Sequence, residues 1–142
     1  MSGLSAFLKQ NALKPESVKY VISKRFVDEK GNPIEWEIRA ITAEEDEAIR
    51  KACIKRVPIP GRKGQYTYET DTNLYLAKLA AASVIYPDLN DAQLQDSYGV
   101  MGAENLLKAM LTPGEYAELI QKVQEVNGYD LSFEELVDEA KN

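Results

Sequence analysis

The chain has 142 residues with 44% hydrophobic and 28% charged side chains, the balance of one ordinary folded domain. It has no histidine and one cysteine, which excludes a disulfide framework, a Ser-His-Asp triad and a Cys-His dyad. The formal net charge of −6 argues against general nucleic-acid binding, and no apolar run approaches the length of a membrane span.

The hydrophobic pattern predicts a single α+β domain over residues 1–142 that is predominantly helical. We expect a small antiparallel N-terminal β-hairpin or three-stranded sheet. Three segments follow from the pattern: an N-terminal amphipathic segment (1–14), a β-hairpin (17–41) and a helical region (42–142).

The N-terminal segment carries Leu4, Phe7 and Leu8 at roughly helical spacing within residues 2–13, and Pro15 ends any helix there. We favour a helix docked on the core, because isolated helices this short are marginal in water. The alternative is a detachable helix that meets a partner.

The hairpin is predicted from two alternating runs, residues 18–22 and 34–40, which flank a turn-rich segment at 28–33. The second run should bury Trp36 and send Glu35, Glu37 and Arg39 to solvent. A third short strand at 65–69 would place both of its tyrosines on one side.

Capping signals organise the helical region. Residues 42–45 and 112–115 are capping boxes, which predict helices over 42–57 and 112–126, the latter ended by Asn127-Gly128. Cys53 should be a small core residue. Two prolines and two glycines make residues 57–64 a loop. Further helices are expected over 73–85 (the central core helix), from an Asn90 cap to Gly99, over 103–110, and from Ser132 to the end of the chain.

No pattern points to catalysis, a metal or a cofactor. The acidic run 44–47 lies in the first turns of a helix, where acids are favoured, and residues 88–91 lack the glycine and closing glutamate of a calcium loop. A basic region spans two segments of this acidic chain: Arg50, Lys51, Lys55, Arg56, Arg62 and Lys63. A solvated helix end plus loop is the favoured interpretation, and a patch that meets an acidic partner or another subunit is the alternative.

Three strings carry a family resemblance: WEIRAITAEED at 36–46, YPDLNDAQLQDSYGVMGA at 86–103 and, more weakly, LLKAMLTPGEY at 106–116. Together they resemble the XkdN-like tail assembly chaperones of contractile-tailed phages and PBSX-type prophages. The resemblance runs over nearly the whole chain, and it names no binding residue.

The resemblance implies a non-enzymatic helper in the cytoplasm of the bacterial host, absent from the mature virion. Such a protein would bind the tape measure protein and keep it soluble until the tail tube forms. A longer frameshifted form of the same protein, the tail tube protein and other copies of the chain are further implied partners; nucleic acid and membranes are not. The alternatives are a structural tail or baseplate component that stays in the virion, and a phage-encoded regulator that binds a host protein.

An amphipathic partner needs exposed apolar anchors. We expect them, in order, on the N-terminal segment, between two short helices, and on the last helix. The candidate residues are Leu4, Phe7, Leu8, Tyr98, Val100, Met101, Phe133 and Leu136. They are candidates only: for each of these residues, we favour ordinary packing in the core over contact with a partner.

Overall fold

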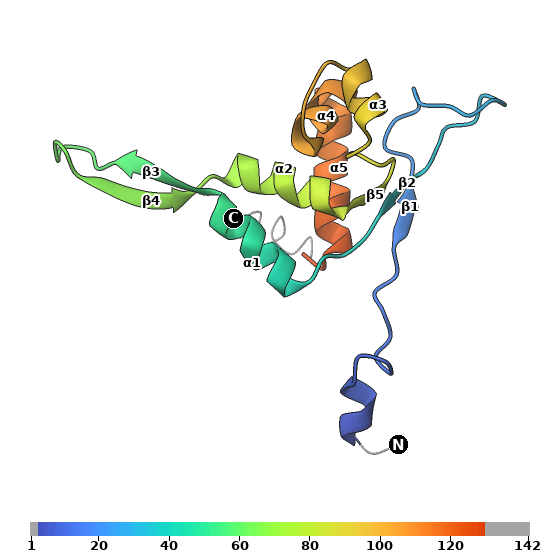
Figure 1. Ribbon diagram of the computed structural model, residues 1–142, viewed down its shortest axis with the longest axis horizontal. Coiled ribbons are helices and arrows are strands. Elements are labelled where there is room, and N and C mark those ends of the chain that lie inside the picture. Colours follow the sequence, from blue (N-terminus) through green and yellow to red (C-terminus); the bar gives the residue numbers. More distant parts are fainter. Residues whose placement is uncertain (1–2, 130–142) are drawn as a thin grey trace, which may run out of the picture.

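The computed structural model describes residues 3–129. Strands and helices are interspersed along the chain, and the strands form two antiparallel sheets (Figure 1). The strands are β1 (Val18–Tyr20), β2 (Trp36–Ile38), β3 (Ile54–Pro58), β4 (Tyr66–Thr70) and β5 (Val84–Tyr86). The helices are the 3-10 helix η1 (Gly3–Phe7), α1 (Ala43–Ala52), α2 (Thr72–Ser83), α3 (Ala92–Ser97), α4 (Ala103–Met110) and α5 (Pro113–Val126). The α+β class and the excess of helix are therefore confirmed.

The N-terminal sheet is three-stranded and antiparallel, in the order β1-β2-β5. Alternation along β2 buries Trp36 and Ile38, as predicted, and leaves Glu37 partly exposed. The third strand is β5, however, which we expected to be the end of a helix. The segment expected as the third strand pairs with β3 in a separate two-stranded sheet. Pairing between strands decided both outcomes: β5 pairs with the distant β2, and the 65–69 segment pairs with the nearby β3.

The core surrounds α2, which confirms it as the central helix. Its residues Leu79 and Ala80 are fully buried, and the small Ala80 side chain lets neighbouring helices approach closely. Helices α1, α4 and α5 all contact α2. The side chains that they and the sheet contribute include Trp36, Ile38, Leu106, Leu107, Leu119 and Val123.

Both capping boxes form as predicted. The Thr42 hydroxyl accepts from the Glu45 amide at the start of α1, and Thr112 accepts from Glu115 at the start of α5. The expected helix at 103–110 is confirmed with its bounds. The cap of α3 is Asp91 rather than Asn90, because the Asp91 carboxylate is the one that accepts from the Leu94 amide.

Helix α1 ends at Ala52, five residues before the predicted end. The buried Cys53 follows as its cap, and the chain then turns into β3, so Lys55 and Arg56 lie on a strand and not on a helix. Residues 57 and 58 belong to β3 and not to the predicted loop. The reason is the full register with β4, from Ile54 opposite Thr70 to Pro58 opposite Tyr66. β-Branched residues in β3 suit this pairing.

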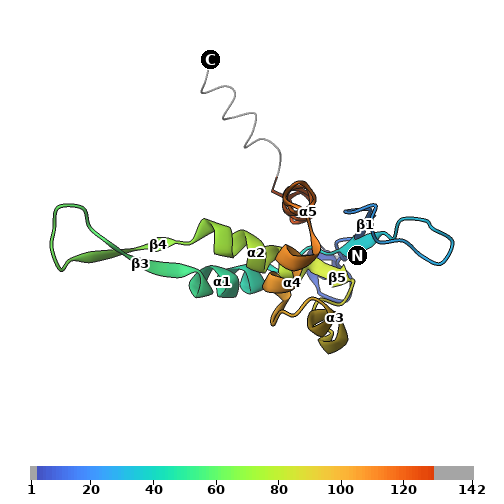
Figure 2. The same ribbon diagram turned by 90° about the horizontal axis from the view of Figure 1, so that it is seen from above.

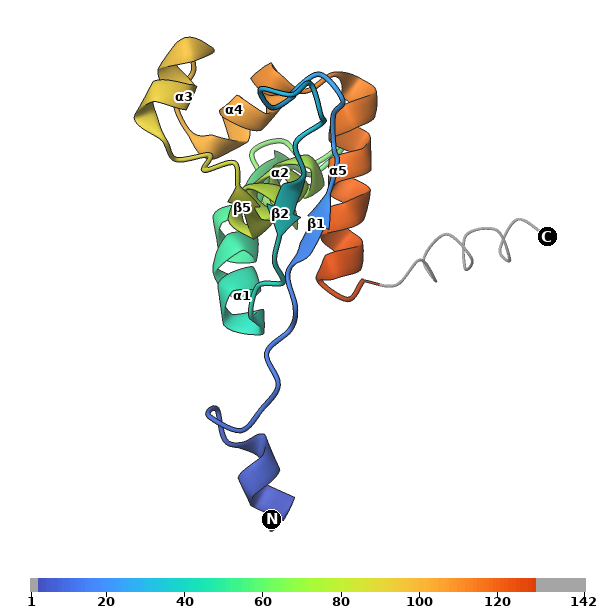
Figure 3. The same ribbon diagram turned by 90° about the vertical axis from the view of Figure 1, so that its right-hand side faces the viewer.

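The N-terminal segment does not dock on the core, so the favoured interpretation was wrong. Only a 3-10 helix forms, and Figure 3 shows it at the end of an extended chain that leads away from β1. Leu4 and Phe7 are 76% and 82% exposed. Their spacing is helical, but among the described residues no part of the body packs over these two side chains. The predicted helix from Ser132 lies outside the described residues, as do Phe133 and Leu136.

Candidate partner-binding surfaces

The N-terminal segment is an apolar surface held in a compact turn. The amides of Asn11 and Ala12 donate to the Leu8 carbonyl, and the Asn11 side chain donates to the Ser5 carbonyl at 2.9 Å. These bonds close the turn after η1. Leu8 is 43% exposed, so with Leu4 and Phe7 the segment presents three large apolar side chains to solvent. Leu13, just beyond the turn, is exposed as well.

The second candidate surface is the connection between α3 and α4. Gln95 braces it, because its side-chain amide donates to the Leu89 carbonyl at 2.8 Å and accepts from the Gly102 amide at 3.1 Å. Gly102 has φ +91°, a conformation that favours glycine. The bracing leaves Met101 85% exposed and Tyr98 37% exposed.

Val100, in the same connection, packs partly against the core. Of the three candidates there, Val100 thus follows the core-packing alternative, whereas Met101 and Tyr98 face solvent. The structure does not bring this surface together with the N-terminal segment: Figure 1 places them on different sides of the body. The third candidate surface, on the predicted last helix, lies outside the described residues.

A further exposed apolar surface was not among the predicted candidates. It lies on the β3–β4 hairpin, which projects from the body opposite β5 (Figures 1 and 2). Ile54, Tyr66 and Tyr68 are exposed there. The sequence does contain a pattern that indicates this surface: Tyr66 and Tyr68 are two residues apart and follow the basic Arg62 and Lys63. Because residues 57–64 were interpreted as a loop, β3 was not recognised as the strand that pairs with β4.

The acidic run at the start of α1 is used for structure. Glu45 accepts from the Arg39 guanidinium at 2.8 and 3.2 Å and from the Thr42 amide, which together lower the pKa of its carboxyl to about 2. Asp46 pairs with Arg50 at 2.8 Å and also accepts from the Tyr75 hydroxyl. The interpretation of these acids as helix-terminal residues therefore fits the geometry.

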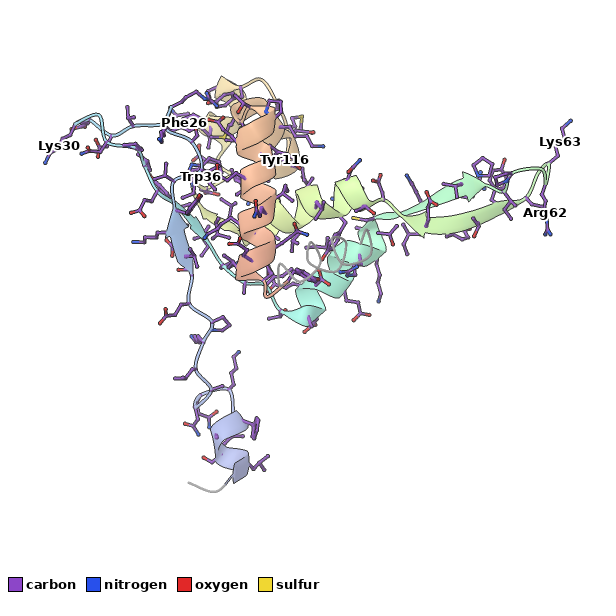
Figure 4. The ribbon with its side chains drawn as sticks, turned by 180° about the vertical axis from the view of Figure 1, so that it is seen from behind. Phe26, Lys30, Trp36, Arg62, Lys63 and Tyr116 are labelled. Carbon is purple, nitrogen blue, oxygen red and sulfur yellow. The ribbon has the colours of Figure 1, made fainter. Side chains whose placement is uncertain are left out.

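A hollow of about 620 Å³ lies between residues 19–25 and the start of α5. One of the carboxylates that line it, that of Glu115, is held by Arg25 at 2.6 Å and by the Ser23 hydroxyl at 2.5 Å. The hydrogen bond from the Arg25 guanidinium has the largest effect on Glu115, and it keeps the pKa of that carboxyl well below its usual range. Glu115 thus stays ionised and paired, and it ties the chain after β1 to α5. Arg25 also stacks on Phe26, which packs against Trp36 (Figure 4).

Among residues 3–129, no group of acidic or cysteine side chains is arranged to hold a metal ion. Within the same range, no helix has both the length and the apolar character to cross a bilayer. A small α+β domain with large apolar side chains exposed on several separate elements has the surface of a protein that binds other proteins.

Comparison with known proteins agrees with this class. Residues 4–141 match the family described as phage XkdN-like tail assembly chaperone proteins. The chain is 35% identical over 142 residues to the phage-like element PBSX protein XkdN of Bacillus subtilis strain 168, covering 98% of this chain and 93% of that protein. It is 33% identical over 140 residues to the uncharacterized protein YqbN of the same organism, with the same coverage.

The fold agrees as well. A crystal structure of the protein YqbN superimposes with a TM-score of 0.77 at 28% identity, over 92% of this chain and 99% of that one. The chain belongs to the XkdN-like family of phage tail assembly chaperones.

Proposed function

We propose that the protein binds the tape measure protein of its phage or prophage and keeps it soluble while the tail tube assembles. The observation that carries this proposal is the N-terminal segment, where Leu4, Phe7 and Leu8 are exposed on a turn that stands away from the body. Family membership supports a role in tail assembly, and the exposed segment supports a contact with an apolar partner.

The mechanism is stoichiometric shielding without turnover. A long amphipathic helix exposes apolar side chains that aggregate in water, and a second apolar segment that covers them removes that surface from solvent. Many copies bound side by side along one long client gain avidity from their proximity. No cofactor is needed for such binding, and catalysis has no part in it.

The place and fate of the protein follow from the same proposal. It acts in the cytoplasm of the bacterial host, is displaced as tube subunits polymerise around the tape measure, and is absent from the mature virion. A longer frameshifted form of the protein and the tail tube protein are the other partners that we propose for this stage.

The test is co-expression with the tape measure protein encoded in the same genome, followed by affinity purification and measurement of the soluble fraction. We expect the tape measure protein to be insoluble alone and to co-purify with the full chain. Removal of residues 2–13 should abolish co-purification, because it removes the exposed anchors and leaves the core intact. A control chain that keeps these residues and carries Val27→Ser, a change of an exposed side chain on a distant loop, should behave like the wild type.

Two results would count against the proposal. The first is a tape measure protein that stays insoluble with every version of the chain. The second is recovery of the protein from purified phage particles in the amounts of a structural subunit, which would indicate a tail or baseplate component.

A further inference from the structure

The ladder of the β3–β4 hairpin shows which backbone groups point out of its edges. In an antiparallel pair of strands, opposed residues alternate between pairs that exchange hydrogen bonds with each other and pairs that do not. Near the tip, the Ile59 amide donates to the Gln65 carbonyl at 3.0 Å, so these two residues are a bonded pair. The next bonded pair, two residues further along each strand, is Val57 and Thr67.

The residues between the bonded pairs point their backbone groups outward. The bond from the Asp71 amide to the Cys53 carbonyl, at the base of the hairpin, has the same phase. On β4 the outward groups therefore include those of Tyr66 and Tyr68. On β3 the residue opposite Tyr66 is Pro58, which has no N–H to donate. β4 is thus the edge on which another strand can form an uninterrupted row of hydrogen bonds.

This edge is both accessible and incomplete. Every residue from 61 to 70 is exposed, and among the described residues this sheet has β3 and β4 as its only strands. A two-stranded hairpin is marginally stable in water, and a third strand or packing against another element stabilises it. An exposed sheet edge is a surface to which an extended peptide adds as a further strand.

The side chains next to the edge supply an apolar face. Opposed residues share a side of the ladder, and one side carries Ile54, Arg56, Tyr66 and Tyr68. The Arg56 guanidinium lies 4.1 Å from the centre of the Tyr66 ring, and Tyr68 is 71% exposed. Tyrosine and arginine are enriched at the energetic centres of protein interfaces. A strand added at β4 would therefore place every second side chain beside these two tyrosines.

Charge indicates the chemistry of the added segment. Residues 54–70 hold four basic residues and one acidic residue, so the hairpin carries +3 and the rest of the chain carries −9. Arg62 and Lys63 stand at the tip (Figure 4), where they attract acidic side chains. A nucleic acid is the poorer match, because the body repels its phosphates and it has no peptide groups that continue a sheet.

We propose that the free edge of β4 binds an extended segment of another protein by strand addition. The segment carries β-branched or other apolar residues that cover Tyr66 and Tyr68, and acidic residues that reach Arg62 and Lys63. β4 runs from the tip toward the body, and antiparallel pairing is the more stable kind, so the acidic residues lie at the C-terminal end of the segment. The contact is separate from the N-terminal segment and does not rest on the proposed function.

The first experiment measures backbone amides of the full chain by NMR. The probe is a synthetic peptide of alternating threonine and valine that ends in a run of glutamates. In the free chain, the Tyr66 and Tyr68 amides should exchange with deuterium much faster than the bonded Thr67 amide. At about 90% saturation with the peptide, exchange at both tyrosines should slow roughly tenfold, because only the free fraction exchanges. Removal of residues 2–13 should leave this binding unchanged.

Charge at the tip is tested with matched variants. Arg62→Glu/Lys63→Glu should weaken peptide binding roughly tenfold or more. The control Lys24→Glu/Lys30→Glu changes the net charge equally on another exposed segment and should bind like the wild type. A peptide of the same composition with its glutamates at the N-terminal end should bind more weakly, because antiparallel pairing then places them away from the tip.

Two substitutions of one residue separate the backbone from the side chain. Tyr68→Thr and Tyr68→Pro both remove the ring, but only proline removes the outward N–H, and neither touches a bond to β3. Tyr68→Pro should bind roughly tenfold more weakly than Tyr68→Thr. Slow exchange at Thr67 and the thermal unfolding of each variant check that the hairpin and the body are folded.

Three results would overturn the proposal. The first is the absence of saturable peptide binding to the wild-type chain. The second is equal affinity of the two Tyr68 variants, which would mean that the peptide contacts side chains and not the strand edge. The third is protection of the Tyr66 and Tyr68 amides that rises with the concentration of the chain alone and that the peptide does not change, which would mean that a second copy occupies the edge.

Discussion

Replacing Phe7 with serine distinguishes a free N-terminal segment from a docked one. Phe7 is 82% exposed, so the folded chain hides less than a fifth of it from water. Full burial of a phenylalanine contributes about 1.5–3 kcal/mol. The hidden fifth therefore amounts to about 0.5 kcal/mol at most, and Phe7→Ser should leave the free energy of unfolding nearly unchanged.

The same arithmetic sets the expected loss of binding. If the tape measure protein covers the exposed part of Phe7, the substitution removes roughly 1.2–2.5 kcal/mol of binding free energy, an affinity roughly eightfold to seventyfold weaker. The large effect is thus expected on binding and the small one on stability. A docked side chain would show the opposite pattern.

Two assays measure these quantities. Urea unfolding gives stability, and competition gives relative affinity: a complex of the tape measure protein with tagged wild-type chain is incubated with untagged variant, and displacement is followed. Val27→Ser, at an exposed residue of the loop after β1, is the control and should displace like the wild type. A loss of more than about 1 kcal/mol of stability, or displacement as efficient as that of the wild type, would refute the reasoning.

Three further predictions concern the body. Leu119→Ala should lower the free energy of unfolding by about 3 kcal/mol, because Leu119 is fully buried, and Leu13→Ala, at a 97% exposed side chain, should leave it within about 0.5 kcal/mol; urea unfolding checks both. Asn127→Ala should cost roughly 1–3 kcal/mol in the same assay, because the Asn127 side chain accepts from the Ile41 amide, between β2 and α1, and donates to the Ser83 hydroxyl at the end of α2. The Arg39 partner and the Thr42 amide lower the pKa of Glu45 from 4.5 to about 2, so its contribution is present above pH 4.5 and is lost as the pH falls towards 2. The stability gap between wild type and Glu45→Gln should therefore narrow over that range, and a gap that stays constant would contradict the assignment.

The candidate surfaces were predictable to different degrees. The apolar residues Leu4 and Phe7 are visible in the sequence as an amphipathic segment, but their exposure is not, because it depends on whether the body offers a groove. Val100 and Met101 are adjacent apolar residues, and the sequence does not distinguish them. The turn between α3 and α4, held by Gln95, leaves Met101 exposed and packs Val100 partly against the core. The surface predicted around Phe133 and Leu136 lies outside the described residues and stays a prediction.

Local chemistry in the sequence was enough to predict the starts of α1 and α5. The capping boxes at Thr42 and Thr112 act within four residues, and the stripe along α5 repeats with the helix period, so neither needs a distant partner. Alternation alone likewise predicts that Trp36 faces the core.

Tertiary structure decided the features that depend on contacts between separate elements. Residues 54–58 could have continued α1, and they form a strand only because β4, a loop away, completes their backbone hydrogen bonds. Val84 leaves α2 for a strand because β2 offers a free edge almost 50 residues earlier in the chain. The sequence by itself determined the two capping boxes, the core helix and the α+β class. Only the fold decided the hairpin, the third strand and the exposure of the N-terminal segment, since each depends on pairing or packing with residues that a local pattern does not contain.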